Sequence, residues 1–205
     1  MFRFLKKAEW FIDGNVITIT LVDKEVEYDP AKMNVYGMEI VFEITEKGEY
    51  IREKLAERCY IADVQIVRRL ESKIDGTVKY LYRLFDGQLI ESVLMKYKHG
   101  YTVCISTQVG CRMGCSFCAS GINGLARNLT ASEMIAQLLA AQRDNDIRVS
   151  NVVMMGMGEP LDNFDNSVKF LKLVSDDEGL NIGLRHISLS TSGVVSGIKK
   201  LAKYN

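Results

Sequence analysis

Three cysteines occupy one short segment of the chain and constrain its structure most strongly. They are Cys111, Cys115 and Cys118, in the run CRMGCSFC, with the spacing C-x3-C-x2-C. Thiolates are the usual ligands of iron–sulfur clusters, so this loop can bind three irons of a [4Fe–4S] cluster. The fourth iron then lacks a protein ligand and is free to bind a small molecule. The spacing therefore indicates chemistry on a bound molecule rather than simple electron storage.

A structural zinc site is the main alternative for this triplet. Such sites need four ligands, usually arranged as two separated pairs. The candidates for a fourth ligand, Cys104 and His186, lie on expected strands, and a third interpretation treats the cysteines as packing residues. We favour the iron–sulfur cluster, because the triplet stands alone and glycines beside it, Gly110 and Gly114, let the backbone fold tightly around a ligand.

The composition limits the class of protein. The chain has 205 residues, of which 47% are apolar, enough for one domain or two small ones. Its 26 basic and 26 acidic residues give zero net charge, which argues against a strongly basic coat but allows a local basic patch. No apolar run is long enough to span a bilayer, and the first residues lack the features of a signal peptide. Together with five cysteines, this predicts a cytoplasmic protein without a membrane partner.

The hydrophobic pattern divides the chain into three regions. Residues 1–48 form a β-rich segment of unknown role, with strands expected at 16–22 and 38–44. Residues 49–99 form an accessory region, in which a short helix at 49–58 precedes an antiparallel meander. The expected strands of this meander lie at 64–70, 78–84 and 89–95. Asp-Gly pairs separate them and favour tight hairpins whose two central residues both have positive φ.

Residues 100–205 predict an α/β fold. Strands are expected at 101–106, 151–156 and 186–191, and each is followed by a helix. A capping box of Thr130 and Glu133 begins the first of these helices, and the others are expected at 165–175 and 194–203. The apolar run within 151–156 is typical of a strand buried on both faces. Three successive β/α units imply a parallel sheet with right-handed crossovers.

The polar motifs of this region follow the strands. Ligands bind at the carboxyl ends of parallel strands, where the chain places the cysteine loop, GMGEP at 156–160 and STSG at 190–193. The first glycine-rich motif can be a simple turn, or it can let a ligand approach the backbone. Glu159 is suited to accept hydrogen bonds from an ammonium group. Ser190 and Ser192 can cap the next helix, or they can bind a ribose or a carboxylate.

Five further residues have ordinary explanations when they are read alone. Cys104 resembles a buried, unreactive cysteine, and Glu91 resembles a solvated residue of a strand. Arg112, Arg127 and Lys96 are candidates for phosphate contacts, although surface basic residues are common.

The cysteine spacing, with Phe117 before the third cysteine, resembles the radical S-adenosylmethionine (SAM) superfamily. In that family the open iron binds the amino and carboxylate groups of SAM, and the reduced cluster cleaves it to a 5′-deoxyadenosyl radical. The similarity is closer to the adenosine-C2 RNA methyltransferases, which act on 23S rRNA and in some bacteria on tRNA. The C8-methylating antibiotic-resistance enzymes are nearly alike. The similarity to the adenosine-C2 methyltransferases runs from about residue 50 onward. Four segments carry it: CISTQVGCRMGCSFCASGINGLARNLTASEMIAQ, NVVMMGMGEPLDNFDNSVKFL, ISLSTSGVVSGIKKLA and SKIDGTVKYLYRLFDGQLIESVLM.

This resemblance implies a fold, cofactors and partners. The fold is a partial radical SAM (β/α) barrel with about three β/α units, preceded by the β-rich region. The cofactors are a [4Fe–4S] cluster and SAM, and the partners are an RNA substrate, 23S rRNA and/or tRNA, and an external electron donor. The oligomeric state is left open.

The resemblance also implies roles for individual residues. The cluster ligands are Cys111, Cys115 and Cys118. The expected contacts to SAM are Phe117, Gly158, Glu159 and Ser190. Two residues correspond to catalytic groups, the cysteine that resolves a covalent enzyme–RNA intermediate and the acidic proton acceptor: Cys104 and Glu91.

Two features depart from the family pattern. The methyl-carrying cysteine of this family lies far towards the C-terminus, and none of the five cysteines here matches it. The family barrel needs six β/α units, of which three are visible, and residues 1–48 do not resemble the helical accessory domain usual in the family. We therefore expect an N-terminal portion of such an enzyme that does not complete methyl transfer alone. Another radical SAM enzyme, or a non-catalytic cluster-binding fragment, is the alternative.

Overall fold

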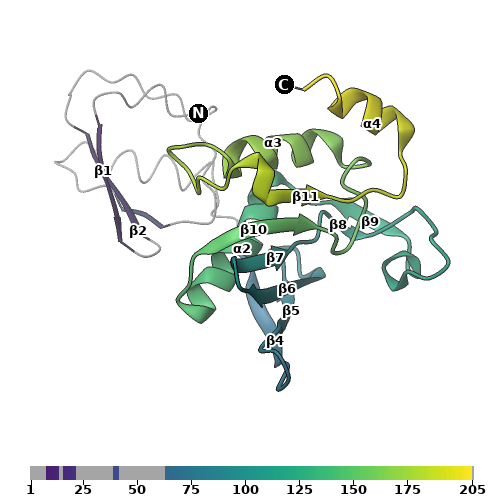
Figure 1. Ribbon diagram of the computed structural model, residues 1–205, viewed down its shortest axis with the longest axis horizontal. Coiled ribbons are helices and arrows are strands. Elements are labelled where there is room, and N and C mark those ends of the chain that lie inside the picture. The colour runs from purple at the N-terminus through teal and green to yellow at the C-terminus, as the bar shows by residue number, and fades with distance from the viewer. Residues whose placement is uncertain (1–7, 14–15, 22–38, 42–62, 205) are drawn as a thin grey trace. The chain divides into compact units, whose positions relative to one another are not determined.

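A computed structural model describes four parts of the chain, residues 8–13, 16–21, 39–41 and 63–204 (Figure 1). Its contacts divide the chain into two compact units, residues 1–63 and 64–205. Among the described residues, none of the helices has the length and apolar character that a membrane span requires.

The first unit contains a small three-stranded sheet. Strand β1 (Ala8–Asp13) pairs antiparallel with β2 (Val16–Leu21), and β2 pairs parallel with β3 (Glu39–Val41). Strands β2 and β3 match two expected strands, whereas β1 was not predicted. The helix expected at 49–58 lies outside the described residues.

The second unit is built on a six-stranded mixed sheet, across which the colours of Figure 1 run from β4 to β11. In spatial order its strands are β11 (Ile187–Leu189), β10 (Val149–Met154), β7 (Gly100–Cys104), β6 (Leu89–Tyr97), β5 (Val78–Arg83) and β4 (Gln65–Glu71). Strands β4 to β7 pair antiparallel, which confirms the predicted meander. Strands β7, β10 and β11 pair parallel, as the β/α pattern predicts. The meander and the parallel strands therefore form one continuous sheet.

Each parallel strand leads to a helix, in the order α2 (Ala131–Asn145), α3 (Phe164–Val174) and α4 (Val195–Leu201). The predicted capping box of α2 is confirmed. Thr130 Oγ1 accepts a hydrogen bond from Glu133 N at 3.2 Å, and Glu133 Oε2 accepts one from Thr130 N at 2.9 Å. These bonds satisfy two amides that have no partner within the first helical turn.

The large sheet has one covered and one open face. Side chains on the covered face are fully buried, as in Tyr80, Ile90, Val103 and Val152, each 0% exposed. Helices α2 and α3 contact each other and so lie on the same side of the sheet. Residues that alternate with the buried ones form the open face, and among them Met155 is 61% exposed. The prediction that residues 151–156 are buried on both faces is therefore wrong, because no described element covers the second face.

The Asp-Gly turns of the meander also differ from the prediction. Only the glycines have positive φ, +70° at Gly76 and +82° at Gly87. The aspartates instead use their side chains, because the Oδ1 atoms of Asp75 and Asp86 each accept a backbone N–H two residues later at 3.1 Å. The turn is thus stabilised by an aspartate acceptor and a single glycine rather than by two positive φ angles.

Candidate active site: the cysteine loop and the strand ends

A short β-ribbon frames the cysteine loop, and the sequence pattern did not reveal it. Strand β8 (Gln108–Gly110) pairs antiparallel with β9 (Leu125–Asn128) on either side of the loop. Gly110 has φ +76°, and a Cβ there would lie 2.0 Å from the carbonyl oxygen of Gly124. The same oxygen accepts the backbone N–H of Cys111 at 3.0 Å. The ribbon therefore closes at the first cysteine and requires glycine there.

The three cysteines are free thiols of increasing exposure along the loop. Cys111 is buried, Cys115 is half-buried and Cys118 is exposed. Cys118 N donates to the carbonyl of Cys115 at 3.0 Å, which forms a turn between them. In the part of the chain that the structure describes, no three potential ligands are gathered closely enough to hold a metal ion. The three thiols are a donor set that fits an iron–sulfur cluster.

The loop after β10 is joined to the segment after β7 by hydrogen bonds. Met157 N donates to Ser106 Oγ at 2.9 Å, and Thr107 N donates to the carbonyl of Met157 at 2.8 Å. Gly156 N donates to the carbonyl of Ile105 at 3.0 Å. The GMGEP motif therefore lies beside the chain that leads into the cysteine loop.

Gln108 connects this loop to the β-ribbon, a role that no sequence pattern indicated. Its side chain is completely buried, and its Oε1 accepts the backbone N–H of Glu159 at 2.8 Å. Its Nε2 donates to Asn128 at 2.7 Å and to Asp162 at 2.9 Å. Gly158, with φ +99°, packs so closely that a Cβ there would lie 2.5 Å from Gln108 Cβ. A glutamine in a strand of three residues carries no distinctive sequence signal, so only the fold reveals this role.

Glu159 is buried, at 3% exposed, and both of its carboxylate oxygens have partners within the protein. Oε1 accepts Leu161 N at 3.0 Å, and Oε2 accepts Ser192 N at 2.6 Å and Ser192 Oγ at 2.9 Å. Glu159 thus links the loop after β10 to the loop after β11. Its expected contact with SAM stays a prediction, because the carboxylate here bonds to the protein.

Two serines expected to cap the helix after β11 do not do so. The N-cap of α4 is Val194, and no side chain caps this helix. Ser192 instead donates its hydroxyl to Glu159, and the backbone N–H of Gly193 donates to Thr191 Oγ1 at 3.1 Å. Ser190 lies directly after β11 and is half-buried. Its contact with a cofactor stays a prediction.

Cys104 and Glu91 lie on adjoining strands of the open face. Cys104 is in register with Val93, and Glu91 is two residues from Val93 along β6, so both side chains face the same side. Burial raises the pKa of the Cys104 thiol, with a smaller opposing effect from the backbone N–H of Met155. Glu91 is half exposed and forms an ion pair with Lys79, with 2.7 Å between Nζ and Oε1.

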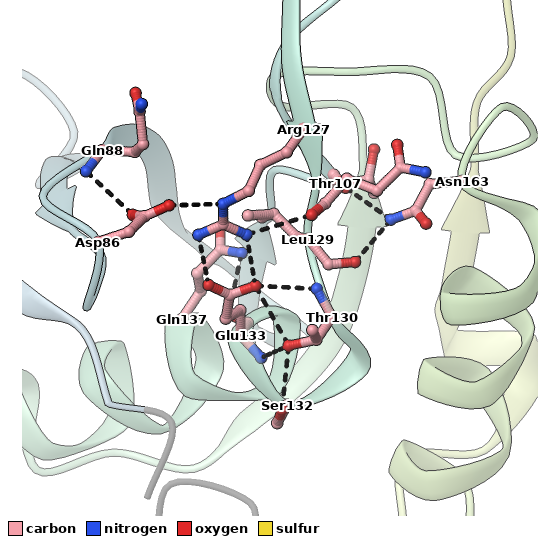
Figure 2. A network of polar contacts seen from close by, with 11 residues as sticks. Asp86, Gln88, Thr107, Arg127, Leu129, Thr130, Ser132, Glu133, Gln137 and Asn163 are labelled. Carbon is pink, nitrogen blue, oxygen red and sulfur yellow. Dashed lines mark hydrogen bonds and ion pairs between the residues drawn. The ribbon is translucent and has the colours of Figure 1, made fainter. Parts of the chain in front are cut away.

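The basic residues considered as phosphate contacts are held by other groups. Figure 2 shows Arg127 between Asp86, at 2.6 Å, and Glu133, at 2.7 and 2.9 Å. These carboxylates raise the pKa of Arg127, and the largest cause is the hydrogen bonding of its guanidinium to Glu133. Arg127 therefore links β9, the turn after β5 and the start of α2.

Beside this network, Asn163 Nδ2 donates to the carbonyls of Thr107, at 2.8 Å, and Leu129, at 2.7 Å (Figure 2). Arg112 pairs with Asp162, and Lys96 Nζ lies 5.9 Å from the centroid of the Tyr101 ring. The guanidinium groups of Arg112 and Arg127 are thus both engaged by carboxylates.

Comparison with known proteins relates a large part of the chain to a known family. Residues 105–205 match the family described as the radical SAM superfamily. The chain is 56% identical over 166 residues to the probable dual-specificity RNA methyltransferase RlmN of Alkaliphilus oremlandii, a match that covers 81% of this chain and 48% of the relative. It is 59% identical over 151 residues to the protein of the same name from Clostridium novyi, with 74% and 44% covered.

A solved structure supports the same assignment. The crystal structure of a radical SAM methyltransferase from Sphaerobacter thermophilus superposes with a TM-score of 0.70 at 44% identity, covering 78% of this chain and 47% of that chain. The chain spans about half the length of the relatives it matches. The mixed sheet with its three β/α units therefore has a partial radical SAM fold, and residues 105–205 of this chain match the radical SAM superfamily.

Proposed function

We propose that this chain takes part in the radical SAM methylation of an adenosine ring carbon in RNA, with C2 as the favoured atom. The proposed substrates are 23S rRNA and/or tRNA. One observation carries the proposal: the cysteine loop, Gly158, Glu159 and Ser192 are linked at the ends of the parallel strands, next to an open face that holds Cys104 and Glu91. The relatives named as dual-specificity RNA methyltransferases support the choice of RNA.

The cofactor sites follow from the same residues. Cys111, Cys115 and Cys118 would hold a [4Fe–4S] cluster, and the segments of Phe117, Gly158, Glu159 and Ser190 would bind SAM. When bound and reduced by an external donor, the cluster supplies the electron that cleaves SAM to a 5′-deoxyadenosyl radical. Position 158 requires glycine, because any side chain there would collide with Gln108, and this lets the loop after β10 pack closely against β8.

The open face would carry out the proton and thiol chemistry. A thiolate is the nucleophilic form of cysteine, and burial keeps Cys104 protonated at neutral pH. We assign Cys104 to the release of the RNA from its covalent link with the enzyme. After losing its proton to a base, its sulfur would form a disulfide with the linking cysteine, which none of the five cysteines here matches. The carbon–sulfur bond of the link would then break, and the carbon would take up a proton to become the methyl group. Glu91 would accept the proton from the adenine carbon, because its exposed carboxylate lies on the same face, and Lys79 fixes its position.

An RNA base must leave its stack to reach such a site, and the flanking phosphates then need cationic partners. Three basic residues occupy the open face of the meander beside Glu91. Arg68 is in register with Leu81, which is in register with Glu91, while Lys79 and Arg83 are two residues to either side of Leu81. We place the RNA backbone across this surface.

The cofactor part of the proposal is tested by anaerobic reconstitution of the chain with iron and sulfide. Metal analysis should find iron rather than zinc. Addition of SAM and a reductant should then yield 5′-deoxyadenosine. Cys115→Ala serves as the control and should lose both the cluster and the product. A chain that binds zinc, or a fully loaded chain that binds SAM but makes no 5′-deoxyadenosine, would overturn the assignment.

The RNA part is tested by measuring the affinity for 23S rRNA and tRNA fragments against salt concentration. The double variant Arg68→Gln/Arg83→Gln should bind more weakly, and its salt slope should fall by roughly two, one for each lost phosphate contact. Arg69→Gln is the matched control, because Arg69 bonds to Asp144 towards the covered face. If the double variant and the wild type bind RNA with equal affinity, the RNA does not bind across the open face.

The methylated atom is tested separately. The RNA is incubated with the loaded chain and methyl-labelled SAM, and its nucleosides are then separated. We expect no labelled adenosine from these 205 residues, because none of their cysteines matches the methyl carrier. Labelled 2-methyladenosine would contradict that expectation but support the choice of C2, whereas labelled 8-methyladenosine would overturn it.

A further inference from the structure

We propose that Arg112, Asp162 and Gln108 form a positioning relay that holds the cysteine loop against the cofactor loop of Gly158 and Glu159. None of the three is expected to touch a reacting atom. Their role is to fix where the cluster lies relative to SAM. The identity of these two ligands rests on the proposed function, whereas the relay itself rests on contacts in the protein.

The relay begins inside the cysteine triplet. Arg112 follows Cys111 directly, and its Nε donates to both carboxylate oxygens of Asp162, at 3.2 and 3.0 Å. Its Nη2 donates to Oδ1 of the same carboxylate, so the guanidinium and the carboxylate form a bidentate ion pair. Within residues 111–118, all of which the structure describes, no other side chain forms a hydrogen bond or ion pair. Arg112 is therefore the loop's only polar side-chain anchor.

Asp162 is a fixed partner for this arginine. Its side chain is only 12% exposed, and its Oδ2 also accepts a hydrogen bond from Gln108 Nε2 at 2.9 Å. Its backbone N–H donates to the carbonyl of Glu159 at 3.1 Å. The carboxylate that anchors the cysteine loop is thus anchored in turn to the cofactor loop.

Gln108 completes the relay. Its amide is fully buried, and its Oε1 accepts the backbone N–H of Glu159 at 2.8 Å. Three of its atoms would lie within 2.5 to 2.8 Å of a Cβ at Gly158, so the two residues cannot move independently. A displacement of the cysteine loop is consequently transmitted to the backbone that is expected to receive SAM.

The exposure of Arg112 distinguishes positioning from overall stability. Its side chain is 62% exposed, and an ion pair with one exposed partner contributes little to global unfolding. The loop itself has few other contacts, so the same pair can dominate local opening of residues 111–118. Loss of the pair should therefore loosen the loop without unfolding the domain.

The test compares Arg112→Gln, Asp162→Asn and the double variant with the wild type. Iron release to a chelator should be about fivefold faster in each single variant, which corresponds to about 1 kcal/mol at 1.4 kcal/mol per tenfold. The double variant should be no faster than the singles, because both changes break one contact. Iron release from Arg112→Lys should be slower than from Arg112→Gln but faster than from the wild type, since lysine keeps the charge but cannot form the bidentate ion pair.

Three further readouts separate positioning from a folding defect. Amide hydrogen exchange at Cys118 should accelerate in the cluster-free variants, and SAM should bind about fivefold more weakly. The urea midpoint at neutral pH should fall only slightly, by the contribution of one partly exposed ion pair. Arg148→Gln, at an exposed position directly before β10 and outside both the relay and the proposed RNA surface, is the control and should match the wild type in exchange and iron release. The relay is contradicted if both single variants exchange amides and release iron at wild-type rates. It is also contradicted if the effects of the two single variants add in the double variant. If no cluster binds, the proposed function fails, but amide exchange still tests the relay.

Discussion

The buried carboxylate of Glu159 accepts two hydrogen bonds from Ser192, one from its backbone N–H at 2.6 Å and one from its hydroxyl at 2.9 Å. This contact joins the loops that follow two neighbouring parallel strands, β10 and β11. Ligands of open parallel sheets bind at such strand ends. The shape of the expected SAM site therefore depends on an interaction between two loops that are more than thirty residues apart.

The first prediction concerns this contact. Glu159→Gln should lower the free energy of unfolding by about 1.5–3 kcal/mol, because it removes a buried charged acceptor. Ser192→Ala removes one hydroxyl bond and should cost about 1 kcal/mol. Urea denaturation measures both values, with Ser196→Ala on the exposed part of α4 as the control. If Glu159 shapes the SAM site by linking the two loops, Ser192→Ala should also weaken SAM binding. An unchanged affinity for SAM would instead favour direct contact between SAM and the Glu159 carboxylate.

The second prediction compares two glycines that both have positive φ. Gly158 has φ +99° and is crowded by Gln108, whereas Gly193 has φ +103° and has open space where a Cβ would lie. Gly193→Ala should therefore cost about 1–3 kcal/mol from backbone strain alone. Gly158→Ala should cost a further 1–3 kcal/mol or so, because the methyl group overpacks the buried glutamine. Equal losses in urea denaturation would show that the crowding at Gly158 relaxes freely.

The third prediction concerns the reactivity of Cys104. Burial raises the pKa of its thiol, so little thiolate is present at neutral pH. Iodoacetamide should label Cys104 more slowly than the exposed Cys118 in the cluster-free protein, and its rate should rise as the pH becomes alkaline. Peptide mass spectrometry over a time course measures each site separately. Rapid labelling of Cys104 at pH 7 would show that the protein neither shields this thiol from the reagent nor raises its pKa.

The fourth prediction follows from Asp162. The hydrogen bond from Arg112 is the largest cause that lowers the pKa of this carboxyl below its ordinary value, and Gln108 adds to it. A carboxyl with a lowered pKa stabilises the fold above its unfolded-state pKa, and this contribution is lost as the pH falls through the folded-state pKa. The wild type should therefore lose more stability than Asp162→Asn below about pH 4. Arg112→Gln should reduce the difference, and parallel pH profiles for all three proteins would contradict the ion pair.

Local patterns in the sequence predicted much of the fold correctly. The capping box of Thr130 and Glu133, the meander strands and the alternation of strands with helices each depend on residues close together in the chain. The cysteine spacing likewise predicted the radical SAM superfamily, whose family model matches residues 105–205. These features are readable because periodicity, capping and motif spacing act over a few residues.

Other features arise only when distant segments meet. Strands β8 and β9 are too short to show periodicity, and they pair only because the cysteine loop returns on itself. Gln108 becomes central because a buried amide must find partners, which the fold supplies from β9 and the loop after β10. The sequence by itself determined the cysteine spacing and the motifs from which we predict the residues that carry the chemistry. The tertiary structure decided which of them touch, because a buried polar group is stabilised by whatever partner the fold brings to it, at any distance along the chain.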